Sequence, residues 1–252
     1  MSPLHALAIL AAGFVAGTIN VIVGSGSLVT FPTLLALGYP PVLANVSNTV
    51  GLTPGNASAI VAYRRELGGQ RARLIQLGGA SLLGALLGAA LLLALPDSVF
   101  KSVVPGLIAL AALLMAIQPR LKAALERRAP QKTHGGAALL AGVFATGIYG
   151  GYFGAAQGVI LIALLAIFID DDLQNLNGTK NALAFVANGV ASILFIASTS
   201  VSWSVVGLIA IGSILGGQVG GRYGRRIPAP ALRWVVVVAG LIIAAILAAE
   251  WH

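Results

Sequence analysis

Long stretches without a formal charge most limit what this chain can fold into. The first Asp, Glu, Lys or Arg is Arg64. Further uncharged stretches cover residues 74–96, 102–119, 133–169, 181–221 and 234–249. A membrane-spanning helix needs about 20 largely apolar residues. Only 9% of the residues are charged, whereas soluble proteins carry about 25%. The sequence therefore predicts an all-α polytopic membrane protein with almost no room for a soluble domain.

Positive charges are concentrated in three short loops between the apolar stretches. These basic loops are residues 64–73, 118–135 and 222–233. Lys and Arg tend to remain on the cytoplasmic side of membrane proteins. We therefore place the three loops in the cytoplasm and interpret the chain as a multi-pass membrane protein. The same distribution explains the net charge of +8 without a nucleic-acid partner, which we exclude.

The segments 4–37 and 136–169 are too long for a single membrane crossing. Each has about 34 residues, which as a straight helix would be about 51 Å long, and the hydrocarbon core is only about 30 Å thick. Glycine-rich breaks interrupt both segments, at residues 24–27 and 150–158. If the basic loops are cytoplasmic, each segment must begin and end on one side. We therefore predict two re-entrant hairpins of short helices, which enter from opposite sides.

The two halves of the chain match each other in sequence. Asn45 corresponds to Asn177 and Asn56 to Asn188, in both cases 132 residues apart. Each half would be a hairpin followed by three crossings, at 43–63, 74–95 and 99–117 and at 175–197, 204–221 and 232–249. Because three crossings is an odd number, the second half would be inserted upside down, as in the inverted-topology repeats of many secondary transporters.

This repeat divides the chain into three parts within one membrane domain. They are a first membrane repeat (1–117), a basic cytoplasmic linker (118–135) and a second, inverted repeat (136–252). An alternative treats each hairpin as one kinked span, which makes the repeats parallel. It would place the basic loop 222–233 outside, which the charge rule disfavours.

Polar side chains inside the predicted spans mark a candidate binding site, because such groups are costly in a membrane. The first set is Asn45, Asn48, Thr49 and Asn56, and the second is Asn177, Lys180, Asn181 and Asn188. Residues 11 apart lie nearly in line on an α-helix. The first set therefore forms one stripe with Asn48 beside it, and the second forms an equivalent stripe with Lys180 beside it. The two stripes could build one shared site. The alternative is that the Asn side chains bond across packed helices.

Lys180 carries a formal charge inside a predicted span, where it could neutralise an anionic substrate. It could instead extend toward the inner interface, or pair with the acidic run 170–172. If Lys180 does not pair with it, we expect the acidic run to cap the N-terminus of the following helix.

The glycine-rich breaks offer a second means of holding an anion. Where a hairpin turns near the midplane, the returning helix begins, and its free N–H groups and dipole favour negative charge. The groups concerned are Gly24, Ser25, Gly26 and Ser27 in the first break and Gly154, Gln157 and Gly158 in the second. The alternative is close helix packing, which accounts for many of the 32 glycines.

The sequence lacks the groups that most enzymes and metal proteins need. The predicted spans contain no Asp or Glu, the chain has no cysteine, and its three histidines lie at segment ends. No HExxH, GxSxG or Walker A motif is present. We therefore expect no catalytic residues, no metal site and no cofactor, and a protein that is not an enzyme. The usual carboxylate proton relay is also missing.

Several segments together resemble a known family. They are residues 12–17, the 24–27 break followed by Pro32, residues 44–49, residues 142–158 and residues 177–179. These segments are similar to the sulfite exporter (TauE/SafE) family of anion permeases, over nearly the whole chain. The glycine run of the family is interrupted here by Ser25 and Ser27 and by residues 155–157. The resemblance implies an inverted repeat, a plasma-membrane location, and export or uptake of sulfite or a small organosulfonate such as sulfoacetate.

The residues and the resemblance together predict a secondary transporter of a small sulfur oxyanion or organosulfonate. It would work by alternating access around a midplane site at the repeat interface. Its partners would be the small anionic substrate, the lipid bilayer and a coupling proton or sodium ion. Two alternatives stay open, a transporter of a neutral or cationic small solute and a non-transporting membrane scaffold.

Overall fold

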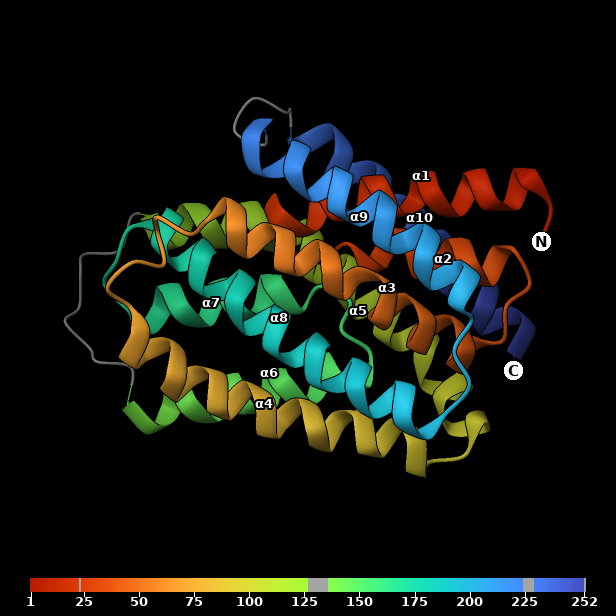
Figure 1. The fold of residues 1–252 in the computed structure, drawn as a ribbon, viewed down its shortest axis with the longest axis horizontal. Coiled ribbons are helices and arrows are strands. Elements are labelled where there is room, and N and C mark those ends of the chain that lie inside the picture. Colours follow the sequence, from red (N-terminus) through yellow and green to blue (C-terminus); the bar gives the residue numbers. More distant parts are fainter. Residues whose placement is uncertain (23, 127–135, 224–228, 252) are drawn as a thin grey trace.

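Helices are the only regular secondary structure in the part that the computed structural model describes, residues 1–22, 24–126, 136–223 and 229–251. The helices (Figure 1) are α1 (Pro3–Ile22), α2 (Ser27–Ala36), α3 (Pro41–Ala62), α4 (Arg71–Ala94), α5 (Asp97–Glu126), α6 (Gly136–Tyr152), α7 (Gln157–Phe168), α8 (Leu173–Ser198), α9 (Trp203–Tyr223) and α10 (Ala229–Trp251). Five of them, α1, α4, α5, α8 and α9, are long and apolar enough to cross a membrane. The predicted all-α class of multi-pass membrane protein is confirmed.

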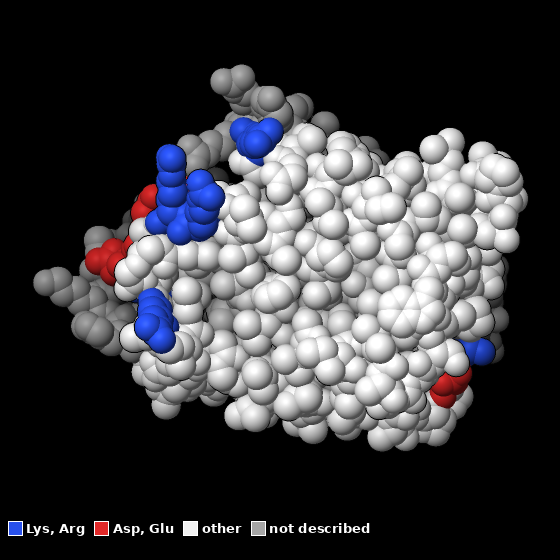
Figure 2. All heavy atoms as spheres, in the orientation of Figure 1, with Lys and Arg blue, Asp and Glu red and all other residues white. Residues whose placement is uncertain are grey.

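Charged side chains lie at the two ends of the long axis (Figure 2). On the face shown, most gather at the end where α3 connects to α4, and a small group lies at the opposite end, where α4 connects to α5. We call these the inner end, defined by the basic loop 64–73, and the outer end, defined by Asp97 and Lys101. The uncharged band between them is the surface that the hydrocarbon core of a bilayer requires.

The first hairpin begins and ends at the outer end. α1 runs inward from the N-terminus and α2 returns (Figure 1), and the hydroxyl of Tyr39, which follows α2, lies 3.8 Å from the sulfur of Met1. With 20 residues, α1 is longer than the short helix expected, because nothing interrupts it before the break at residues 24–27. At about 1.5 Å per residue it is about 30 Å long, whereas α2 has 10 residues.

The second hairpin enters from the inner end (Figure 1). Helices α6 and α7 pack antiparallel. A Cβ atom on Gly142 would lie 3.1 Å from the side chain of Leu164, and one on Gly150, later in α6, would lie 2.3 Å from the side chain of Gln157, earlier in α7. Leu139 and Leu165 belong to the same buried cluster. The two helices have 17 and 12 residues, so neither reaches the length of about 20 residues that a span needs.

Two predicted spans differ from the helices observed. α3 is long enough to cross the membrane but is not apolar enough to be a candidate span, because its Asn, Ser and Thr side chains lower its hydropathy. It is enclosed instead by contacts with α1, α2, α5, α8 and α9. α5 continues through Pro119 to Glu126, beyond the predicted end at residue 117. Of the predicted basic loops, residues 127–135 and 224–228 lie outside the described residues.

Contacts between helices recur in pairs across the two halves. α1 packs on α9 as α6 packs on α4, and α3 packs on α9 as α8 packs on α4. The pairs α3–α8 and α5–α10 join the halves directly. Two inverted repeats exchanged across a common centre would produce this pattern. The repeat itself, with boundaries at 1–117 and 136–252, stays a prediction.

Glycines let these helix pairs approach until backbone meets backbone. A Cβ atom on Gly88 of α4 would lie 2.0 Å from the carbonyl oxygen of Ile148 in α6. A Cβ atom on Gly216 of α9 would lie 1.9 Å from the carbonyl oxygen of Phe14 in α1. Small residues at helix interfaces are the usual device for close packing inside a membrane. Part of the glycine excess therefore serves the α4–α6 and α1–α9 contacts.

We expect Gly88→Ala to destabilise the protein, because its new Cβ atom would overlap a backbone carbonyl that cannot move alone. The expected cost is about 1–3 kcal/mol, seen as a lower midpoint of thermal unfolding in detergent. Gly79→Ala, on the same helix, is the matched control, since nothing lies within 4 Å of its Cβ position. That variant should be as stable as wild type or slightly more stable. Equal midpoints for the two variants would contradict the close α4–α6 contact.

Single introduced cysteines can report the orientation of the protein in the membrane. The chain has no cysteine of its own, so only the introduced thiol can be labelled. The variants Ser2→Cys and Ser98→Cys place an exposed thiol at the outer end, and Arg65→Cys places one at the inner end. We expect a membrane-impermeant maleimide to label the first two on intact cells and the third only after permeabilisation. Labelling of Ser2→Cys together with Arg65→Cys would show instead that α1 and α2 form one kinked span.

Candidate functional site

The tips of the two hairpins meet through their backbones. The N–H of Gly158, at the start of α7, donates a hydrogen bond to the carbonyl oxygen of Gly24 at 3.1 Å. A Cβ atom on either glycine would lie 2.5 Å from the Cα atom of the other. Gly24 and Gly154 also have φ angles of +86° and +78°, which glycine adopts without steric cost. The structure therefore brings together the two breaks that the sequence singled out.

Two asparagines of α3 bind the hairpins. The Nδ2 of Asn45 donates to the carbonyl oxygen of Tyr152, in the last turn of α6, at 3.0 Å. The Oδ1 of Asn48 accepts a hydrogen bond from the hydroxyl of Thr30 in α2. The predicted stripe on α3 thus faces one hairpin of each half.

Lys180 of α8 is buried, with 1% of its surface exposed. Its Nζ donates to the carbonyl oxygen of Val21, in the last turn of α1, at 3.4 Å. That carbonyl belongs to the negative end of the α1 dipole, which favours a cation. Lys180 therefore binds the C-terminal turn of α1 as Asn45 binds that of α6, each across the boundary between the halves.

Lys180 neither extends to the inner interface nor pairs with the acidic run after α7. Asp171 is bonded to Arg73 instead, with 2.7 Å between its Oδ2 and the Arg73 Nη1. In the ranges that the structure covers, no carboxylate forms an ion pair with Lys180. Asp172 is the N-cap residue of α8 but makes no side-chain capping bond, so the expected cap by the acidic run is not formed there.

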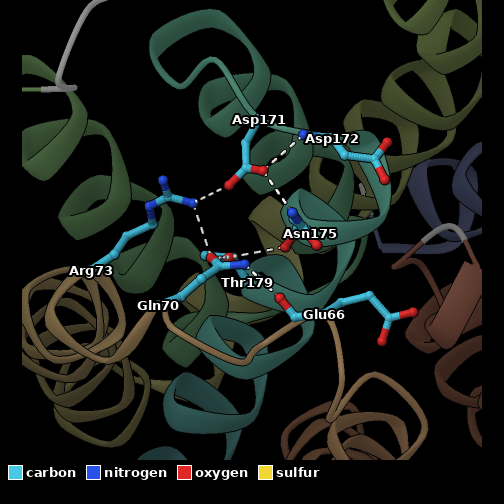
Figure 3. Close-up of polar contacts among 7 residues, drawn as sticks. All are labelled: Glu66, Gln70, Arg73, Asp171, Asp172, Asn175 and Thr179. Carbon is cyan, nitrogen blue, oxygen red and sulfur yellow. Dashed lines mark hydrogen bonds and ion pairs between the residues drawn. The ribbon is translucent and has the colours of Figure 1, made fainter.

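A polar network joins the two halves at the inner end (Figure 3). Arg73, at the start of α4, donates to the Oε1 of Gln70 at 2.9 Å as well as to Asp171. The hydroxyl of Thr179 in α8 donates to the same Gln70 oxygen at 2.8 Å. The network therefore ties the α3–α4 connection of the first half to α8 of the second.

Asp171 is held in its ionised form within this network. Partial burial raises the pKa of Asp171, but the hydrogen bonds from Arg73, Asn175 and the Asp172 N–H outweigh this effect, so the pKa lies below its usual value. The carboxylate stays charged at neutral pH, and the contact with Arg73 persists there.

Several predicted site residues carry buried polar atoms without a hydrogen-bond partner among the described residues. These atoms are Ser25 Oγ, Asn45 Oδ1, Asn48 Nδ2, Asn56 Nδ2, Gln157 Nε2 and Oε1, and Asn181 Nδ2. Leaving a buried polar group unpaired costs about 1–3 kcal/mol, so such groups call for a partner. Four of the atoms are amide nitrogens, which can only donate. Donors in this number suit a ligand rich in acceptor oxygens.

The remaining predicted site residues make fewer contacts with other elements of the site. Ser27 and Asn177 are half-buried and make no side-chain hydrogen bond to another described residue. The hydroxyl of Thr49 donates within α3, to a carbonyl one turn earlier. The Oδ1 of Asn188 lies 3.8 Å from the Cβ position of Gly154, which places this side chain beside the second break.

Asn20 is a site residue that the sequence interpretation missed. It lies near the end of α1, where its Nδ2 donates to the Oδ1 of Asn56. Its own Oδ1 accepts from the backbone N–H of Gly26 at 3.3 Å. The available signal was a polar side chain about one turn before the first break. Asn20 thereby connects α1, α3 and the tip of the first hairpin.

Aromatic rings cover the second hairpin tip toward the outer end. The ring centroids of Phe31 in α2 and Phe153 at the tip are 5.2 Å apart, and Phe100 in α5 lies 6.3 Å from Phe153. All three side chains are buried. Within the described residues, no three His, Asp or Glu side chains are grouped so that they could hold a metal ion.

Comparison with known proteins identifies relatives along the whole chain. The sequence model of the sulfite exporter TauE/SafE family matches residues 9–247. A Sinorhizobium sp protein named "Probable membrane transporter protein ORF9" is 28% identical over 247 residues, which is 98% of this chain and 94% of that protein. A "Probable membrane transporter protein" of Haemophilus influenzae is 28% identical over 233 residues, covering 92% of this chain and 90% of its own.

A third relative, "Probable membrane transporter protein YfcA" of Escherichia coli K12, is 25% identical over 257 residues, covering 100% of this chain and 93% of its own. No solved structure gives a significant match. The relatives are named as transporters, in agreement with the expectation of a protein that is not an enzyme. Because the family match extends over nearly all of the sequence, the chain belongs to the sulfite exporter TauE/SafE family.

Proposed function

We propose that this protein is a secondary transporter of a small anion, a sulfur oxyanion or organosulfonate such as sulfite or sulfoacetate. The observation that carries the proposal is Lys180, which is buried and has no acidic partner among the described residues. An ionisable group inside a membrane protein is costly and marks a functional site. A negatively charged substrate would supply the missing partner.

The unpaired amide donors support the same choice of substrate. Asn48 and Asn56 of α3, Asn181 of α8 and Gln157 of α7 each have a buried side-chain nitrogen that no described residue bonds. An oxyanion presents several acceptor oxygens and could satisfy more than one of these donors at once. Ser25 adds a hydroxyl at the first hairpin tip. The Gly158 N–H is already bonded to Gly24, so we assign anion binding chiefly to the side chains.

The relatives support transport in general, and the family description points to sulfite. Three relatives are named probable membrane transporters, and the family is described by sulfite export. We carry over from these names the class of solute and the location in a membrane, which we propose is the plasma membrane. The basic loops would then face the cytoplasm, and the direction of transport would be outward.

Alternating access gives the two closed ends a role. Most of the candidate residues, including Asn48, Asn56 and Lys180, are buried, as an occluded state of a transporter would require. The network of Arg73, Asp171, Gln70 and Thr179 would separate when the site opens to the inner end. The rings of Phe31, Phe100 and Phe153 would separate when it opens to the outer end. Two inverted repeats of similar packing would let these openings alternate, coupled to a proton or sodium ion.

We expect Lys180→Met to weaken anion binding while the protein still folds, since an apolar side chain of similar shape avoids leaving a buried charge unpaired. Loss of a hydrogen bond to a charged group costs about 1.5–3 kcal/mol, or about ten- to a hundredfold in affinity. Lys101→Met, which removes the same charge from the exposed outer end, should leave affinity unchanged. Flux of sulfite, sulfoacetate, sulfate and taurine into proteoliposomes, with and without a proton or sodium gradient, provides the measurement.

Each outcome of this experiment selects among the candidate functions. Equal sulfite flux in the Lys180→Met and Lys101→Met proteins would remove Lys180 from the site. Flux of taurine without competition from sulfite would favour a transporter of neutral or zwitterionic solutes. If no solute crossed, the scaffold alternative would replace the transporter.

A further inference from the structure

We propose that Asn20 is a positioning residue that sets which end of the Asn56 amide faces the substrate. The proposal rests on the anion site of the proposed function. It identifies the contact that turns one of the hydrogen-bond donors of that site toward the anion. An asparagine side chain has a donating and an accepting end of nearly the same shape. Its neighbours therefore decide which end is turned toward a ligand.

The orientation begins at a backbone group that can only donate. The N–H of Gly26, just before α2, points to the side chain of Asn20 at 3.3 Å. The atom of Asn20 that meets this N–H must accept, so it is Oδ1. The other end of the Asn20 amide is consequently Nδ2, which can only donate.

The orientation of Asn20 fixes that of Asn56 in turn. The Nδ2 of Asn20 is bonded to the side chain of Asn56, and the atom that receives this bond must be Oδ1. The remaining end of Asn56 is its Nδ2, which is buried and has no partner among the described residues. Asn56 is 4% exposed, so solvent does not satisfy it. The backbone of the first hairpin tip thus turns an N–H of Asn56 toward the site.

Asn45, on the same stripe of α3, has the opposite orientation for a parallel reason. Its partner is the carbonyl oxygen of Tyr152, which can only accept, so Asn45 donates its Nδ2 there. Its Oδ1 is buried and accepts no hydrogen bond from any residue that the structure describes. Two asparagines on one helix therefore present opposite ends of their amides, and in each case a backbone group decides which.

We call the hydrogen bonds from the Gly26 N–H through Asn20 to Asn56 the relay. Gly26 holds the start of the relay in place. A Cβ atom on Gly26 would lie 2.6 Å from the carbonyl oxygen of Ala16 and 3.1 Å from the Cβ of Asn20. The tip is therefore packed directly on α1. A rigid donor at this point makes the orientation of Asn20, and through it of Asn56, a property of the fold.

A double-mutant cycle in the full-length protein tests the relay. The variants are Asn20→Leu, Asn56→Leu and both together, and the measurement is the dissociation constant for sulfite, from calorimetric titration in detergent. If Asn20 acts through Asn56, each single variant should weaken sulfite binding at least tenfold and the double variant should be no weaker than Asn56→Leu. Independent, additive losses would overturn the proposal, because a purely structural role of Asn20 would not vanish in the Asn56→Leu background.

A second variant and a control protect the test against misfolding. Asn20→Asp keeps the acceptor for the Gly26 N–H and removes the donor to Asn56, so it should also weaken binding, and its effect should disappear in the Asn56→Leu background. A persistent effect would show that the new charge acts directly and would overturn the relay. The control is Thr53→Val, which removes a hydrogen bond of 2.9 Å between α3 and Ser192 of α8. It should alter stability but not the affinity for sulfite.

The outcome also separates this inference from the proposed function. If wild-type protein binds neither sulfite nor sulfoacetate, the anion site fails and the relay fails with it. If wild-type protein binds sulfite and Asn20→Leu binds it equally well, the relay alone is wrong.

Discussion

The contact between Gly24 and Gly158 is the constraint on which the membrane core depends. Inside a bilayer no water is available to bond an interrupted helix, so irregular backbone is tolerated only where protein encloses it. At the tips of the two hairpins, the N–H of Gly158 bonds to the carbonyl of Gly24 across the gap between them. Asn45 and Lys180 bind carbonyls at the ends of α6 and α1. Because backbone meets backbone at the tips, both glycines must lack a side chain.

The same arrangement explains why the site is rich in donors. The C-terminal turn of α1 attracts Lys180, and Gly26 directs Asn20 and Asn56 so that an amide nitrogen is left over. Residues that complete the backbone bonding of the hairpins therefore also supply the groups proposed to hold an anion. The inner network around Arg73 and the aromatic rings around Phe153 lie on either side of this centre, where the proposed alternating access would need them to close the site.

Much of the architecture could be predicted from the sequence, because hydropathy and glycine breaks are local properties. The uncharged stretches located the helices, and the breaks at 24–27 and 150–158 marked tips that do meet. The length of α1 and the continuation of α5 past Pro119 were not foreseen, since helix ends depend on packing as well as propensity. Asn20 was missed because a single polar residue before a break has no distinguishing pattern.

The sequence alone determined that this is a helical membrane protein with two interrupted segments and polar stripes, because a bilayer imposes length and hydropathy on each segment separately. Only the tertiary structure decided which polar side chains bond to one another and to which backbone groups. Lys180 bonds to Val21, which is far away in the chain. Arg73 forms the ion pair with Asp171, a residue that the sequence offered as a partner for Lys180. Which end of Asn56 faces the site follows from Gly26 through Asn20. Such pairings depend on distances between remote residues, which composition and periodicity do not encode.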